Sequence, residues 1–452
     1  MPDATNADRT FRRIAWRVIP FLFACYVLNF IDRVNVGFAK LQFVHDLHFD
    51  ESVFGIATAL FLVAYAIFEV PSNLLMARIG AGKTLMRIMM LWGTCTVLQM
   101  FMTNAAVLYV LRFLLGAAEA GFFPGMILFM TYWFPDRIRA RMNSILLLAV
   151  PIAGMLGGPL AGWTMSNLQG FLGLRGWQWL FLIEGLPAVI LGLLAPFLLT
   201  DSPNRARWLT PEEKETVQRA LQADLAASDS AVHASAPVRD IFRAPRVLAL
   251  SAVYFCIYIG LVAVTFWMPT ILHHAGVASL STIGWIAGFI SLLTMLGNLA
   301  IAYSSDRCDE RRWHVAGCGF VAALCLLSLP VASHSIVATV VLLAVAQMTV
   351  FTIPIIFWTI PARLFSGRTA AVGIAFISMT GSIGGAASSW LIGAISARTG
   401  SPYAAMSAVA AVLMLGMLLL LGCVKRTHHK APNLPSLAQL AANGEAKHES
   451  AC

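Results

Sequence analysis

The sequence predicts an all-α membrane protein with twelve transmembrane helices, in two six-helix bundles around a central cavity, with both termini in the cytoplasm. Three observations predict this fold class. Of 452 residues, 59% are hydrophobic and 12% are charged, whereas soluble domains carry about half and a quarter, so a soluble fold would expose large apolar patches. Twelve apolar stretches have the length of a membrane span. Lysine and arginine gather on one side of these stretches.

The twelve predicted spans follow one another with mostly short loops between them. A helix needs ~20 apolar residues to cross ~30 Å of hydrocarbon. The first span is not a cleavable signal peptide, because its apolar run is too long, Asp3 and Asp8 precede it and no small-residue cleavage site follows. In chain order the spans are 14–36, 53–76, 84–103, 105–130, 142–165, 177–199, 247–272, 283–304, 314–333, 336–361, 370–395 and 402–424.

The positive charges predict the orientation. Starting from a cytoplasmic N-terminus, 26 of the 31 Lys and Arg residues fall on that same side, two lie within the membrane, and Lys40, Arg175 and Arg398 lie on the opposite side. Lys and Arg in short loops face the cytoplasm, so we expect both termini there and the protein in the inner (plasma) membrane. The net charge of +9 is this bias spread over several loops, so no nucleic-acid partner is expected.

One long polar interruption divides the chain. We expect residues 1–200 to form an N-terminal six-helix bundle, 201–246 a cytoplasmic linker, 247–424 a C-terminal six-helix bundle and 425–452 a cytoplasmic tail. Within the linker, Thr210 followed by Pro211 predicts the cap and first turn of a helix. Basic loops after the second span of each half indicate internal duplication, and transporters built from two repeats bind substrate at the midplane between them.

The sequence lacks the marks of an enzyme, a metal site or a nucleotide site. The eight cysteines are scattered without a CxxC pair or a partnering His cluster, which indicates apolar packing residues. Residues 80–84 end like a phosphate-binding loop, but the upstream glycine and the preceding strand are missing. We therefore expect neither an enzyme nor an ATP-driven pump, and no metal or organic cofactor.

Four charged residues lie within the first and fourth spans: Asp32, Arg33, Arg112 and Glu119. A charge at membrane depth costs a few kcal/mol at least, so it is retained when paired, hydrated or facing a cavity. Arg112 and Glu119 are two helical turns apart on one face, about 10 Å along the axis. One interpretation is a structural ion-pair network between the two helices. The other assigns an arginine to a substrate carboxylate, which its planar fork suits, and an acid to a proton.

Stretches along nearly the whole chain resemble the anion:cation symporter family of the major facilitator superfamily, which carries tartrate, phthalate, hydroxyphenylacetate and sugar acids. They read YVLNFIDRVNVG at 26–37, EVPSN at 69–73, EAGFFPG at 119–125, RGWQWLFLIEGLP at 175–187, ARWLTPEE at 206–213 and SDRCDERRWH at 305–314. The resemblance implies the major facilitator fold. It also implies that cytoplasmic loop motifs hold helix ends together, one with Asn73 and Arg78 and one with Asp306 and Arg307.

The resemblance further implies roles for the intramembrane charges. In sugar-acid symporters of this family, the position of Arg33 binds the substrate carboxylate. The positions of Asp32 and Glu119 take part in proton coupling, and that of Arg112 belongs to the surrounding charge network. We carry these roles over as hypotheses for this chain.

Three further residues are candidates for substrate binding. Tyr65 matches the family's cavity tyrosine, and a tyrosine satisfied within the core is the alternative. Trp358 lies between Pro354 and Pro361, where a broken helix can turn an indole into a cavity, and ordinary packing is the alternative. Ser378 occupies a position of the eleventh span where relatives often carry Asn.

Two departures from the sugar-acid relatives favour a smaller or more aromatic acid, namely Phe30 in place of a cavity tyrosine and serine at Ser378. We predict a monomeric secondary transporter that imports a small organic anion across the bilayer by proton symport and alternating access, with H⁺ as the coupling ion. An anion exchanger and a sodium-coupled symporter are alternatives within transport. A transporter-like anion sensor is the alternative from another class.

Overall fold

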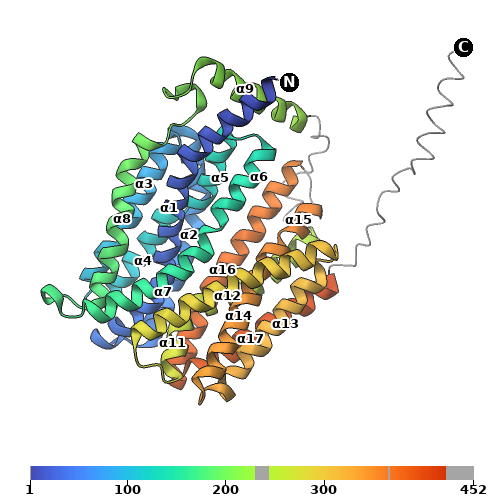
Figure 1. The fold of residues 1–452 in the computed structure, drawn as a ribbon. Coiled ribbons are helices and arrows are strands. Elements are labelled where there is room, and N and C mark those ends of the chain that lie inside the picture. Colours follow the sequence, from blue (N-terminus) through green and yellow to red (C-terminus); the bar gives the residue numbers. More distant parts are fainter. Residues whose placement is uncertain (1, 230–243, 365–366, 424–452) are drawn as a thin grey trace, which may run out of the picture.

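The protein is helical throughout the part that this computed structural model describes, residues 2–229, 244–364 and 367–423 (Figure 1). The α-helices are α1 (Pro2–Asp46), α2 (Glu51–Ile79), α3 (Ala81–Leu98), α4 (Ala105–Glu119), α5 (Phe122–Trp133), α6 (Asp136–Leu147), α7 (Ala149–Asn167), α8 (Gly176–Leu198), α9 (Pro211–Asp229), α11 (Pro245–His274), α12 (Leu280–Arg307), α13 (Arg312–Ala332), α14 (Ile336–Phe357), α15 (Thr359–Leu364), α16 (Gly367–Thr399) and α17 (Pro402–Cys423). Short 3₁₀ turns lie at Gln99–Phe101, Phe171–Gly173 and Pro203–Arg205.

The predicted spans coincide with these helices. Eleven described helical segments are long and apolar enough to cross a membrane, and the eleventh predicted span is a further long helix, α16, of 33 residues. Three predicted spans are each divided between two helices, α4 and α5, α6 and α7, and α14 and α15. The all-α membrane fold is therefore confirmed.

The first helix is longer than its predicted span, which ended at residue 36. α1 continues to Asp46, and Lys40, counted above as an outer-loop residue, lies inside the helix with 1% of its side chain exposed. Placing Lys40 in a loop was wrong. The outer turns of α1 pack against α11 and so carry polar side chains that a hydropathy pattern cannot assign to a span.

Helices from the first part of the chain lie together on one side of the molecule, and those from α11 onward lie on the other (Figure 1). The two groups meet where α2 packs on α16, α7 on α12 and α1 on α11. Glycines permit two of these approaches: a Cβ on Gly55 would lie 2.8 Å from the Cα of Gly393, and one on Gly158 would lie 2.6 Å from the carbonyl oxygen of Gly284. The boundaries at residues 200, 246 and 424 stay a prediction, and the tail at 425–452 lies outside the described residues.

The helix predicted after Thr210 is α9. The Thr210 hydroxyl accepts a hydrogen bond from the Glu213 N–H (3.2 Å), and the Glu213 carboxylate accepts one from the Thr210 N–H (2.9 Å), which forms a capping box. Glu213 also pairs with Arg13 at 3.0 Å, and Trp208 stacks on Trp133 with ring centroids 5.7 Å apart. These contacts fix the start of the linker to the cytoplasmic ends of α1 and α5.

The first cytoplasmic loop motif, residues 73–83, contains no acidic residue, and an aspartate from a distant part of the chain contacts it instead. Arg78 is exposed, and the side chain of Asn73 lies outside the described residues. The carboxylate of Asp201, beyond the end of α8, accepts a hydrogen bond from the Gly82 N–H at 2.9 Å. Asp201 therefore joins the α2–α3 turn to the end of the first group of helices.

The second motif contains its own acid. Asp306 pairs with Arg311 at 2.5 Å, and Arg311 also donates to the Ser305 hydroxyl at 2.8 Å, whereas Arg307 is exposed. These contacts close the turn between α12 and α13.

Candidate functional site

The centre of the candidate site is an ion pair between α1 and α4. Arg33 Nε donates to Glu119 Oε1 at 2.5 Å, and the amide of Asn29, one turn before Arg33, donates to the same oxygen at 2.8 Å. Glu119 is fully buried, whereas 21% of the Arg33 side chain is exposed. Part of the Arg33 side chain is therefore accessible, while its protein partner is shielded.

Glu119 is the last residue of α4, at a break in the fourth membrane-spanning helix. Gly121 has a φ of +86°, in the left-handed region that favours glycine, and α5 begins at Phe122. The fourth spanning helix of the second half is also interrupted, between α14 and α15 at Trp358, where the sequence predicted a break. Interrupted helices in corresponding positions of two halves mark the binding region of repeat-built transporters.

Asp32 faces away from this ion pair, toward α3. Its two carboxylate oxygens accept hydrogen bonds from Trp92 Nε1 and Thr96 Oγ1, each at 3.0 Å, and the residue is 5% exposed. Adjacent residues on a helix point about 100° apart. For this reason Asp32 and Arg33, although neighbours in sequence, enter different surroundings.

Arg112 is buried next to the Phe61 ring, which Arg33 also approaches. Its Cζ is 4.8 Å from the ring centroid, and that of Arg33 is 5.7 Å from the same centroid. Arg112 is 2% exposed, and its Nε and Nη2 find no hydrogen-bond partner among the described residues, although it interacts electrostatically with Asp32 and Glu119. The structure therefore brings the four charges into one interior, with direct pairing between Arg33 and Glu119.

Tyrosines from three helices surround the Arg33 guanidinium. Its Cζ is 4.8 Å from the ring centroid of Tyr65 on α2, a cation–π distance, and it interacts electrostatically with Tyr26 on α1 and Tyr258 on α11. Because α11 belongs to the second group of helices, Arg33 lies where the two groups meet. Sequence reasoning missed Asn29, which its spacing of four from Arg33 could have revealed, and Tyr258, for which the sequence gives no signal.

Trp358 and Ser378 belong to the second group of helices. Trp358 packs on Tyr254 with ring centroids 4.8 Å apart, and Tyr254 lies 5.7 Å from Tyr258. Ser378 is half-buried on α16. None of the hydrogen bonds or ring contacts found among the described residues joins Trp358 or Ser378 directly to Arg33. Ring contacts lead from Trp358 through Tyr254 to Tyr258, which interacts electrostatically with Arg33.

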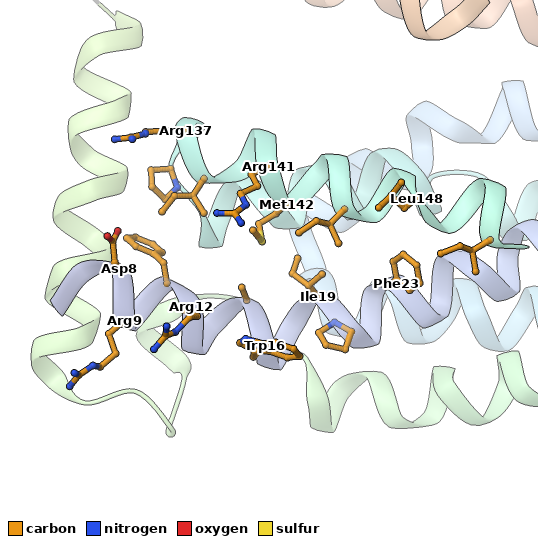
Figure 2. Close-up of a pocket in the computed structure, with 17 residues that line it drawn as sticks. Asp8, Arg9, Arg12, Trp16, Ile19, Phe23, Arg137, Arg141, Met142 and Leu148 are labelled. Atoms are coloured by element: carbon orange, nitrogen blue, oxygen red, sulfur yellow. The ribbon is translucent and has the colours of Figure 1, made fainter. Parts of the chain in front are cut away.

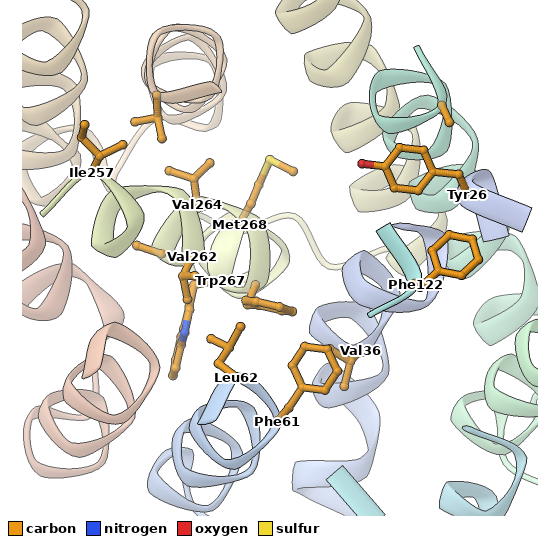
Figure 3. Packing of buried hydrophobic residues seen from close by; sticks show 14 of the residues in the cluster. Tyr26, Val36, Phe61, Leu62, Phe122, Ile257, Val262, Val264, Trp267 and Met268 are labelled. Carbon is orange, nitrogen blue, oxygen red and sulfur yellow. The ribbon is translucent and has the colours of Figure 1, made fainter. Parts of the chain in front are cut away.

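A cavity of about 50 Å³ lies between the two groups of helices. On one side it is lined by Phe30 and Val34 of α1. Facing them, the second group contributes hydroxyl and amide side chains, namely Thr265, Ser291, Thr294, Asn298 and Gln347. Apolar packing borders this interface, with Tyr26, Phe61 and Phe122 on one side and Val264 and Met268 of α11 on the other (Figure 3).

A much larger cavity, about 1220 Å³, lies at the cytoplasmic ends of α1 and α6. Figure 2 shows four arginines near its entrance, Arg9 and Arg12 on α1 and Arg137 and Arg141 on α6. Apolar side chains, among them Ile19, Phe23 and Leu148, lie farther along the helices. The cytoplasmic side of the molecule is therefore hollowed, with basic residues at the entrance and apolar walls within.

The outer side is closed by a buried lysine that the sequence did not single out. Lys40 of α1 forms an ion pair with Glu51 of α2, donates to Thr270 Oγ1 of α11 at 3.0 Å, and lies with its Nζ 3.7 Å from a ring centroid of Trp267, also on α11. This lysine joins both groups of helices at their outer ends. The outer ends of the two groups of helices are therefore held together.

Comparison with known proteins agrees with this architecture. A family model described as Major Facilitator Superfamily matches residues 22–389 and 278–447. A relative in Pseudomonas putida named as the metabolite transport protein NicT is 39% identical over 411 residues, covering 91% of this chain and 93% of that protein. A relative in Agrobacterium vitis named as a tartrate transporter is 39% identical over 419 residues, covering 91% of each.

The fold is also similar to a solved transporter structure. The bacterial homologue of the human lysosomal transporter Spinster, in an inward-facing and occupied conformation, superposes with a TM-score of 0.72, covering 90% of this chain and 96% of that one. The two sequences are 16% identical, so this similarity concerns the fold alone.

Proposed function

The chain belongs to the major facilitator superfamily, and from this premise we propose that it imports a small organic carboxylate by proton symport. The observation that carries the proposal is the pair of Arg33, part of whose side chain is exposed, with the fully buried Glu119. A relative named as a tartrate transporter supports a carboxylate as substrate.

The Arg33–Glu119 pair supports coupling because two carboxylates compete for one guanidinium. In this proposal the ionised Glu119 carboxylate pairs with Arg33 through the contact found in this structure. When Glu119 is protonated it is neutral and loses its ionic attraction to Arg33. A substrate carboxylate can then take the place of the Glu119 carboxylate at the guanidinium. The net charge of the site is the same before and after, so the loaded site can be enclosed without an uncompensated charge in the membrane.

Of the two acids predicted for proton coupling, the geometry favours Glu119. Asp32 already receives two hydrogen bonds from α3 and does not pair with Arg33. We assign Asp32, together with Arg112, to the electrostatic support of the site. The ring of Tyr65, whose centroid is 4.8 Å from the Arg33 Cζ, orients the guanidinium.

Residues of the second group of helices complete the site in this proposal. Trp358 and Ser378 would meet the substrate as the halves close around it, since α14 and α16 both border α11. Closing one side and opening the other exchanges access, and the ligand can drive this only through its different affinity for the two states. In this proposal, proton and anion leave from the state that is open to the cytoplasm.

The test is uptake by protein reconstituted in liposomes with an imposed pH gradient. Glu119→Gln should abolish proton-driven accumulation and spare exchange of substrate between the two sides, because a neutral side chain mimics the permanently protonated acid. Glu184→Gln is the matched control: it is another buried acid of the same half, which accepts a hydrogen bond from Asn35, whereas the ion pair of Arg33 is with Glu119. Accumulation by Glu119→Gln on a pH step would contradict the proposal.

The same assay separates the alternatives. A sodium-coupled symporter would accumulate substrate on a sodium gradient without a pH gradient, and an exchanger would require substrate on the inside. A sensor would accumulate nothing under any gradient.

We further propose that the protein acts as a monomer in the bacterial inner membrane.

A further inference from the structure

We infer that the substrate is a monocarboxylate with a hydroxyl or N–H group at its far end, and that dicarboxylates are rejected, in contrast to the tartrate that the name of the Agrobacterium vitis relative gives. This inference rests on the proposed function, because it takes Arg33 as the carboxylate site. It is carried by the cavity between the halves, whose second wall is uncharged and presents mainly hydrogen-bond acceptors.

Charge is distributed unequally between the two halves. None of the six spans predicted in the second half, from residue 247 to 424, contains Asp, Glu, Lys or Arg. A second carboxylate reaching across the cavity from Arg33 would therefore meet no cation there. In the first half, Lys40 is paired with Glu51 and 1% exposed, and Arg112 is 2% exposed, with its Cζ 4.8 Å from the centroid of the Phe61 ring. An unpaired second carboxylate would lose its hydration without compensation.

The polar groups on the second wall are mostly acceptors. Three hydroxyls lining the cavity donate their hydrogen to the backbone carbonyl four residues earlier, at 2.7–2.9 Å: Thr265, Ser291 and Thr294. A hydroxyl whose hydrogen is used in this way keeps its lone pairs as acceptors. Gln347 directs its amide nitrogen toward Ser291 Oγ at 3.4 Å, which leaves its carbonyl oxygen as an acceptor. Such a wall binds a neutral donor and repels a carboxylate.

Arg33 does not itself line the cavity, but its neighbours Phe30 and Val34 on α1 do, so we infer that one small molecule can use both. Phe30, which lines it, precedes Arg33 by three residues, about 4.5 Å along the helix axis. Phe351 and Met268 form apolar sides of the same cavity. Its volume of about 50 Å³ accommodates a polar substituent rather than a whole substrate, so we assign it to the far end of the molecule.

The experiment is a binding series on the purified wild-type protein in detergent, by calorimetry and thermal shift. It compares three benzoates that differ in one substituent, 4-hydroxybenzoate, 4-methoxybenzoate and terephthalate, and one aliphatic pair, gluconate and glucarate. We expect 4-hydroxybenzoate to bind roughly tenfold more tightly than the methoxy compound, which cannot donate. Within each scaffold, the dicarboxylate should bind more weakly than the hydroxy-monocarboxylate.

A pair of variants assigns the preference to this wall. Thr294→Val removes one acceptor without a change of shape and should weaken 4-hydroxybenzoate binding about fivefold while leaving 4-methoxybenzoate unchanged. Thr349→Val is the matched control, since Thr349 is equally buried and donates to its own helix at 2.7 Å but does not line the cavity. If Thr294→Val does not fold, the wild-type series decides.

Two results would overturn the inference, in distinguishable ways. Dicarboxylates binding as tightly as their hydroxy-monocarboxylate counterparts would contradict it and leave the proposed carboxylate transport intact. No binding by any carboxylate of the series would remove the proposed function and the inference together.

Discussion

At the scale of single residues, two arginines of the same half have been placed in opposite situations. Arg33 has a protein partner 2.5 Å away and an exposed edge, whereas Arg112 is enclosed and two of its nitrogens lack a hydrogen-bond partner among the described residues. Part of the first is accessible to a ligand. The second is enclosed, so in the proposed function it acts on the site through its charge.

The chemistry of Arg33 is tested by Arg33→Lys. Lysine keeps the positive charge but loses the planar fork that binds a carboxylate through two nitrogens. We expect the dissociation constant for a carboxylate substrate to rise roughly 10- to 100-fold, measured by calorimetry, with thermal unfolding close to wild type. Arg87→Lys is the control, because Arg87 bonds Ser72 at 2.9 Å outside the site. Unchanged affinity in Arg33→Lys would remove Arg33 from substrate binding.

At the scale of elements, helix ends determine where charged groups lie. α4 stops at Glu119 because Gly121 adopts a left-handed conformation, and this break leaves the carboxylate at the turn between two helices. Asp50 is the N-cap of α2, and its carboxylate accepts hydrogen bonds from the N–H groups of Ser52 (2.8 Å) and Val53 (3.1 Å). Asp50 lies in the outer loop, so its contribution to stability can be followed by pH.

Hydrogen bonds from Ser52 and Val53 to the carboxylate lower the pKa of Asp50 below its ordinary value of 3.8. A lowered pKa means that the ionised cap stabilises the fold above the ordinary pKa, and that this contribution is lost as pH falls through the lowered value. Asp50→Ala should reduce the free energy of unfolding by about 1 kcal/mol at neutral pH. Asp50→Asn should keep the cap and be less sensitive to acid than wild type below about pH 4.

Thermal unfolding of the three proteins in detergent between pH 3 and pH 7 measures this effect. Equal acid sensitivity of wild type and Asp50→Asn would show that other groups dominate the response. An Asp50→Ala protein as stable as wild type at pH 7 would show that the cap is unimportant for α2.

At the scale of the whole molecule, the outer ends are joined and the cytoplasmic ends enclose a large cavity. α1, α2 and α7 each meet a helix of the second group, and the Lys40 contacts to Glu51, Thr270 and Trp267 hold α1 and α2 to α11. Opening the outer side must break these contacts. We therefore expect Lys40 to influence the balance between inward-open and outward-open states.

Lys40→Met should increase the outward-open population. The variant keeps the length of the side chain and removes the charge, and a loss of about 1–2 kcal/mol would shift the ratio of the two states roughly five- to thirtyfold. Spin labels at Asn167 and Ala278, both exposed at the outer side, report the separation of the halves by pulsed resonance in a cysteine-free background. Lys83→Met, at the exposed cytoplasmic end of α3, is the control. An unchanged distance distribution would contradict this role.

Local pattern predicted the helices, the breaks and the candidate charges. Apolar runs of bilayer length gave the spans, Pro354 and Pro361 indicated the interruption at Trp358, and Thr210 with Pro211 marked the start of α9. The extent of α1 could not be predicted, because its outer turns are buried by protein, where polar side chains are paired rather than excluded. Lys40 was misplaced for that reason.

The sequence by itself determined that the chain spans a membrane and in which orientation. It also determined that four charged residues lie within the spans: Asp32, Arg33, Arg112 and Glu119. These conclusions need no tertiary contacts, because the length of an apolar run and the distribution of positive charge along the chain decide them. Only the tertiary structure decided which of these charges meet. Contacts between α1, α3, α4 and α11 join residues far apart in the chain, and side-chain direction on a helix turns by about 100° per residue, so neighbours such as Asp32 and Arg33 receive different partners.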